Sequence, residues 1–68
     1  MATEAISVNH TASLGFKARV RRVSRLLTQA ELAAMVGVSP EEVNLLECGQ
    51  PLHSEIARRL LLELGLSL

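Results

Sequence analysis

The sequence predicts an all-α fold, a small bundle of four to five short helices in one domain. A chain of 68 residues is long enough for one domain at most. Apolar residues make up 49% of it, with thirteen leucines but a single aromatic residue, Phe16, and this composition suits packed helices better than strands. Signals that start and stop helices also recur at short intervals along the chain.

The first residues carry no clear helical pattern. They lack the charged start and apolar middle of a signal peptide, and they show no sustained amphipathic period. We therefore expect a flexible tail over residues 1–12 and the folded domain over residues 13–68. No apolar run approaches the roughly 18 to 20 residues that span a bilayer, and the single cysteine cannot form an internal disulfide. These features predict a cytoplasmic protein that makes no contact with a membrane.

The first helix is expected from residue 13 to residue 27. Its apolar residues recur at i, i+4, i+7 and i+11, which gathers them on one face of a helix. This predicted core-facing stripe consists of Phe16, Val20, Val23 and Leu27. Next to it lies a basic stripe, which consists of Lys17, Arg21 and Arg25.

The second and third helices each begin with a capping box. Thr28 and Glu31 have the Thr-x-x-Glu spacing in which each side chain accepts a hydrogen bond from the backbone of the other residue. Gly37 is expected to end this second helix. A Ser-Pro-Glu-Glu sequence that begins at Ser39 repeats the signal, with proline at the first helical position. The third helix should run to Cys48 and stop at the next residue, a glycine.

A fourth helix is expected from Ser54 to the glycine at position 65. Its buried stripe should contain Ile56, Leu60 and Leu64. Several leucines then have no obvious place in the core, namely Leu26, Leu45, Leu62, Leu66 and Leu68. Scattered exposed leucines are common, but their number near the carboxyl end of so small a domain predicts a homodimer through the C-terminal leucines.

The second and third helices are joined by a short turn and should form a corner, which is the geometry of a helix-turn-helix. Residues 27–49 closely resemble the helix-turn-helix of the Cro/phage-repressor-like family, the xenobiotic-response-element type. The matching positions are Leu27, Thr28, Gln29, Glu31, Leu32, Ala33, Gly37, Ser39, Val43, Leu46, Glu47 and Gly49. The resemblance implies a lambda-repressor-like DNA-binding domain and a transcriptional regulator that binds double-stranded DNA.

The resemblance also implies which residues contact DNA. The helix that begins at Pro40 would enter the major groove, and Thr28 and Gln29 would lie near a phosphate at the amino end of the preceding helix. Gln29 is the best single candidate for such a contact; the alternative is a solvated first-turn residue. Ser39 could contact a phosphate or only cap its helix.

The outer side of the third helix is unusual for such a reader of bases. Glu41 can accept a hydrogen bond from cytosine N4, Asn44 can pair with adenine, and Leu45 can touch a thymine methyl group. Proline at position 40 lies on the same side. Glu41 also has a purely structural interpretation, because a carboxylate stabilises the amino end of a helix.

Charge is segregated along the chain although the total is zero. Residues 1–27 carry five cations and one acid, whereas residues 28–68 carry two cations and six acids. An acidic helix in the groove opposes the attraction of the phosphates. Lys17, Arg21 and Arg25 could supply phosphate contacts, or could form a solvated face. The acidic third helix leaves a second hypothesis open, a degenerate helix-turn-helix that binds a protein partner and not DNA.

The composition argues against an enzyme. The chain has no Asp, Tyr or Trp, two His and one Cys. It therefore cannot assemble a Ser-His-Asp triad or a four-ligand structural zinc site by itself. We expect no catalytic residues, no metal and no cofactor.

Overall fold

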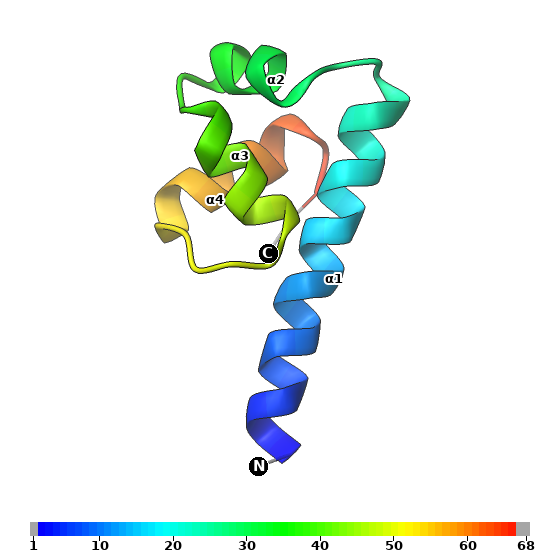
Figure 1. The fold of residues 1–68 in the computed structure, drawn as a ribbon, viewed down its shortest axis with the longest axis vertical. Coiled ribbons are helices and arrows are strands. Elements are labelled where there is room, and N and C mark those ends of the chain that lie inside the picture. Colours follow the sequence, from blue (N-terminus) through cyan, green and yellow to red (C-terminus); the bar gives the residue numbers. More distant parts are fainter. Residues whose placement is uncertain (1, 67–68) are drawn as a thin grey trace.

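A computed structural model describes the backbone of residues 2–66 and the side chains of residues 13–66. This part of the chain contains four helices and no strand (Figure 1), which confirms the all-α prediction. The helices are α1 (Ala2–Ser24), α2 (Gln29–Val36), α3 (Pro40–Glu47) and α4 (Ser54–Glu63). Within the described residues, none of these helices combines the length and the apolar character that crossing a bilayer requires.

Helix α1 is much longer than the sequence pattern indicated. We expected a tail over residues 1–12, but the backbone is already helical at Ala2; Met1 lies outside the described residues. Residues 2–12 contain no glycine or proline, so nothing stops the helix of residues 13–24 from extending towards the amino end. Figure 1 shows this first half of α1 reaching beyond the other three helices. The flexibility of the segment stays a prediction.

The face of α1 that meets the core differs from the predicted one. Phe16, Val20 and Val23 are 66%, 49% and 52% exposed, so the expected stripe lies on the outside of the helix. Gly15 and Ala18 are buried in its place. A methyl group at Gly15 would clash with the carbonyl oxygen of Leu46 and lie 2.9 Å from that of Glu47. Small residues occupy the buried face of α1 because they let its backbone approach the carboxyl end of α3 closely.

Both capping boxes are confirmed. The amide of Glu31 donates to Thr28 Oγ1 at 3.0 Å, and the amide of Thr28 donates to Glu31 Oε1 at 2.8 Å. Ser39 and Glu42 make the same reciprocal pair at 3.1 and 2.9 Å. Gly37 ends α2 as expected, with a φ of 82°. Helix α3 ends at its last glutamate, one residue earlier than predicted.

The turn between α1 and α2 has no glycine. Leu26 takes the left-handed conformation there, with a φ of 60° and 90% of its surface exposed. The next amide, of Leu27, reaches back to the carbonyl oxygen of Arg22 at 3.2 Å. This pattern is the Schellman end of a helix, in which glycine is the usual residue at the left-handed position. Leu27 itself packs against the core, as predicted.

The core lies between α2, α3 and α4, and the small face of α1 closes it. Its buried residues are Ala18, Leu32, Ala33, Val43, Leu46, Ala57, Leu60, Leu61 and Leu64. Leu60 and Leu64 confirm the predicted stripe of α4, whereas Ile56 is only partly buried. The stripe missed Leu61, which is buried because α4 has neighbours on a wider arc than a single stripe covers.

Candidate nucleic-acid interface

The amino end of α2 and the outer side of α3 meet α1 at a shallow hollow. It has a volume of about 220 Å³ and is lined by Arg19, Arg22, Gln29, Asn44, Glu47 and Cys48. The corner between α2 and α3 follows from the two capping boxes, because each box fixes the residue at which its helix begins. This brings residues that are 15 apart in sequence, Gln29 and Asn44, into contact.

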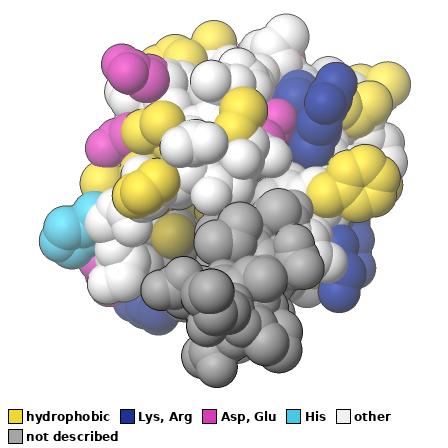
Figure 2. Space-filling view, turned by 60° about the horizontal axis from the view of Figure 1, so that its bottom comes forward, with side chains coloured by type: hydrophobic (Ala, Val, Ile, Leu, Met, Phe, Trp, Pro, Cys, Tyr) yellow, Lys and Arg dark blue, Asp and Glu magenta, His cyan; other side chains and the backbone are white. Residues whose placement is uncertain are grey.

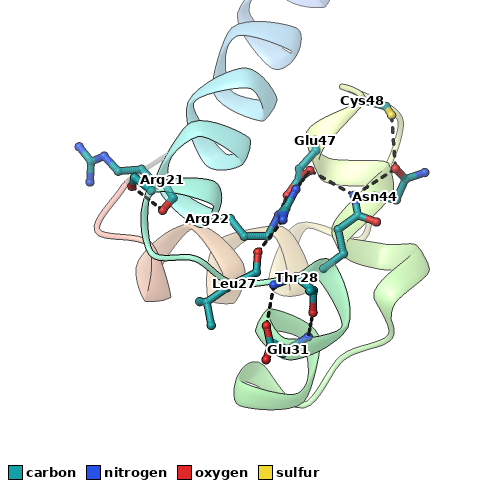
Figure 3. A network of polar contacts seen from close by, with 10 residues as sticks. Arg21, Arg22, Leu27, Thr28, Glu31, Asn44, Glu47 and Cys48 are labelled. Carbon is teal, nitrogen blue, oxygen red and sulfur yellow. Dashed lines mark hydrogen bonds and ion pairs between the residues drawn. The ribbon is translucent and has the colours of Figure 1, made fainter.

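An ion pair forms the floor of the hollow. Arg22 Nε and Nη2 donate to the two carboxylate oxygens of Glu47 at 2.5 and 3.1 Å, and Arg22 Nη1 donates to the carbonyl oxygen of Leu27 at 2.7 Å. The two side chains are only 11% and 4% exposed. The hydrogen bond to Glu47 raises the pKa of Arg22, against the opposing effect of burial. Figure 3 shows this pair between α1 and α3.

Gln29 is held in place by the residues around this pair. Its Nε2 donates to Asn44 Oδ1 at 3.2 Å and to Glu47 Oε1 at 3.1 Å. The Cys48 thiol also points at Asn44 Oδ1, at 3.7 Å. The oxygen of Asn44 is therefore engaged within the protein. A base that used both ends of this amide would have to displace these contacts.

The other residues predicted to contact DNA differ in the exposure of their side chains and in whether their polar groups already have partners. Pro40 and Glu41 are exposed, and Leu45 is half-buried. Thr28 and Ser39 are exposed, but their hydroxyl groups accept the capping hydrogen bonds. Their capping role is thus seen directly, while contact with a phosphate stays a prediction.

The acidity of α3 is smaller at the surface than its sequence suggests. Glu42 accepts a hydrogen bond from the backbone of Ser39 as part of the cap. Glu47 is buried against Arg22. Only Glu41 remains as an exposed acid of α3 with neither a capping bond nor an ion pair to another described residue.

The three cations that were predicted to contact phosphates lie in two places. Arg21 Nη1 donates to the carbonyl oxygen of Leu64 at 3.0 Å, and Arg25 Nη1 donates to that of Glu63 at 2.8 Å, so both reach the carboxyl end of α4. Lys17 lies beside Phe16 on the outer side of α1. None of the three lines the hollow beside α3. Their contact with phosphates stays a prediction, and this placement does not favour it.

Two cations line the hollow; Arg22 is paired with Glu47, and Arg19 is the other, to which the sequence interpretation gave no role. The sequence interpretation gave Arg19 no role because it assigned the wrong face of α1 to the core. Once Gly15 and Ala18 are placed inward, helical geometry puts Arg19 at the edge next to α3. A glycine in mid-helix was the available signal, because it marks a close approach of another backbone.

The comparisons with known proteins agree with this geometry. The helix-turn-helix family model HTH_3 matches residues 19–68. Neither the curated proteins nor the solved structures contain a significant match. The match includes the corner of α2 and α3, the buried partners Arg22 and Glu47, and the whole of α4. The chain therefore belongs to the HTH_3 family of helix-turn-helix domains, which are typically the non-enzymatic DNA-binding domains of transcriptional regulators.

Proposed function

We propose that this chain is a sequence-specific DNA-binding regulator that places α3 in the major groove. The supporting observation is the hollow in which Arg19, Gln29 and Asn44 meet. It joins a cation, an amide at the start of α2 and an amide on α3 in one surface. Phosphate contacts position a protein on the duplex and base contacts select the sequence, and these three side chains offer both.

Gln29 and Arg19 contact the phosphate backbone in this proposal. The amino end of α2 offers backbone amides without a partner inside the helix, and these favour an anion. When Gln29 turns towards a phosphate it leaves Glu47, but Arg22 still neutralises that carboxylate. The exchange therefore leaves no buried charge without a partner.

Asn44, Glu41 and Leu45 read the bases. Asn44 releases its hydrogen bonds with Gln29 and with the thiol of Cys48, and presents its side-chain amide to adenine. Glu41 accepts from cytosine, and the exposed part of Leu45 contacts a thymine methyl group. Arg22 is neutralised by Glu47, so Arg19 is the one cation of the hollow left to a phosphate, and Glu41 brings a carboxylate to the base edges. Affinity therefore depends less on salt than it does in a strongly basic repressor.

A homodimer would give the domain two half-sites. Met35 and Leu62 are each more than half exposed and line one hollow of about 360 Å³ with Arg59 and Glu63. Two α4 helices that cross in opposite directions would place Arg59 of each copy near Glu63 of the other. This self-complementary charge supports pairing through α4. The proposal also includes a cytoplasmic location.

Fluorescence anisotropy with a labelled random duplex tests DNA binding, at 50 and 200 mM salt. Arg19→Ala and Gln29→Ala should each weaken binding by about tenfold, and Arg19→Ala should lower the salt slope by about one. Glu41→Lys should strengthen binding without regard to sequence. Arg58→Ala is the matched control, because Arg58 pairs with Glu55 on the exposed side of α4; it should change the affinity little.

Two results would contradict the proposal. One is an Arg58→Ala effect as large as that of Arg19→Ala, which would show that only total charge matters. The other is no binding by the parent protein at low salt. The second result would favour the alternative function, a helix-turn-helix that binds a protein through the outer side of α3.

A further inference from the structure

The outer face of α1 carries apolar side chains, although the exposed face of a helix is usually polar. Phe16, Val20 and Val23 follow the i, i+4, i+7 spacing of one helical face, and all three are about half exposed or more. Gly15 and Ala18 occupy the opposite, buried face. The stripe therefore contributes little to the core of this chain, and an apolar helix face of this kind marks a surface for contact with another molecule.

A hollow runs beside this stripe. It is formed between α1 and the segment after α4, has a volume of about 350 Å³, and is lined by Phe16, Lys17, Val20, Arg21 and Leu66. Figure 2 shows hydrophobic side chains next to Lys and Arg side chains on one side of the molecule, whereas most of the visible acids lie on the other. A hollow of this size accepts one or two apolar side chains from a partner.

The charges around the stripe indicate what kind of partner fits it. Lys17 and Arg21 line the hollow on one edge of the stripe, and Arg19 lies on the other edge of α1. No acidic side chain among residues 13–66 lines this hollow. Two copies that met through their stripes would bring these cations together, and like charges in contact are unfavourable. The stripe is thus unsuited to a symmetric dimer.

We propose that this face of α1 binds an acidic amphipathic helix of another protein. Such a helix lays its apolar side chains along Phe16, Val20 and Val23, and inserts one into the hollow against Leu66. Its carboxylates pair with Lys17 and Arg21. A bilayer fits less well, because a broad surface cannot fill a hollow between α1 and the chain end. The proposal does not depend on DNA binding, which uses the other edge of α1.

The probe is a synthetic 18-residue helical peptide with leucines along one face and glutamates on both flanks. A second peptide carries lysine at every glutamate position. Binding of each to the full chain is measured by fluorescence anisotropy. We expect the acidic peptide to bind and the basic one to bind at least tenfold more weakly, because the cations would repel it.

Variants locate the site. Phe16→Ala should weaken binding of the acidic peptide by about tenfold, since it removes the largest apolar contact. Met35→Ala is the matched control, an exposed apolar residue on α2, and should have no effect. Lys17→Glu should weaken binding of the acidic peptide and strengthen binding of the basic one. All three side chains are exposed, so circular dichroism should show unchanged folding.

Several outcomes would overturn the proposal: no binding of the acidic peptide, equal binding by Phe16→Ala and Met35→Ala, or equal binding of both peptides. Tighter peptide binding after removal of Ser67 and Leu68 would identify the end of this chain as the occupant. Binding to phosphatidylserine vesicles that Phe16→Ala abolishes, without peptide binding, would identify a lipid surface.

Discussion

Glu47 connects three parts of the molecule through one carboxylate. It accepts hydrogen bonds from Arg22 of α1 and from Gln29 at the start of α2, while belonging to α3 itself. Arg22 extends the connection to the turn before α2 through the carbonyl oxygen of Leu27. Because Glu47 is almost fully buried, its charge would be strongly unfavourable without this partner. The pair therefore fixes both the packing of α1 and the position of Gln29.

Loss of Arg22 should destabilise the fold. Arg22→Met leaves a buried carboxylate without a cationic partner, and we expect the free energy of unfolding to fall by about 3 kcal/mol. The double variant with Glu47→Leu should recover part of this loss, because both charges are then absent. Urea denaturation of the single and double variants measures the coupling. Arg58→Met, in an exposed pair, is the control; an equal loss there would contradict the role given to the buried pair.

At the scale of elements, the contact between α1 and α3 depends on a glycine inside a helix. Glycine is a poor helix former, so its presence in α1 needs a compensating gain. The gain is the close approach of the two backbones at Gly15, where the carbonyl oxygens of α3 leave no room for a methyl group. The same approach turns Phe16 and Val20 outward. One small residue thus decides which side of α1 is buried.

Gly15→Ala should destabilise the protein, although alanine is the better helix former by about 1 kcal/mol. We expect a net loss of about 1–3 kcal/mol, because the added methyl group forces the helices apart. Thermal unfolding measures the loss. Ser13→Ala, at an exposed position of the same helix, should leave stability unchanged or slightly higher. A stabilising Gly15→Ala would show that the two helices do not approach this closely.

At the scale of the whole molecule, the proposed contacts use separate surfaces. The proposed DNA surface lies on α3 and the start of α2, the apolar stripe lies on the far side of α1, and the exposed pair Met35 and Leu62 lies over α2 and α4. Arg21 and Arg25 hold the carboxyl end of α4 against α1. Both cations lie near the negative end of the α4 dipole and stabilise it.

Dimerisation through α4 is testable without DNA. Leu62→Arg places a charge in the middle of the proposed contact and should convert a dimer to a monomer in sedimentation velocity. Leu26→Arg adds the same charge at an exposed turn away from that hollow and should leave the dimer intact. A monomeric parent protein at the highest accessible concentration would exclude this pairing, and dissociation by both variants would place the contact elsewhere.

The sequence by itself determined the helices α2 to α4 and the corner between α2 and α3. Those features rest on local chemistry, since a capping box such as that of Thr28 and Glu31 forms between residues three apart. The family resemblance assigned Gln29 to a phosphate and Asn44 to a base, which stays a prediction; that the two side chains contact each other is a finding of the structure. The core of α4 followed in most positions from its own periodicity.

Only the tertiary structure decided the orientation of α1. Its apolar period pointed to Phe16, Val20 and Val23, but burial depends on what the neighbouring helix can accept, and α3 accepts Gly15 and Ala18. That choice moved Arg19, to which the sequence interpretation gave no role, to the hollow that we propose contacts DNA. Periodicity finds an apolar face on a helix, but it cannot tell whether this chain or another molecule covers it.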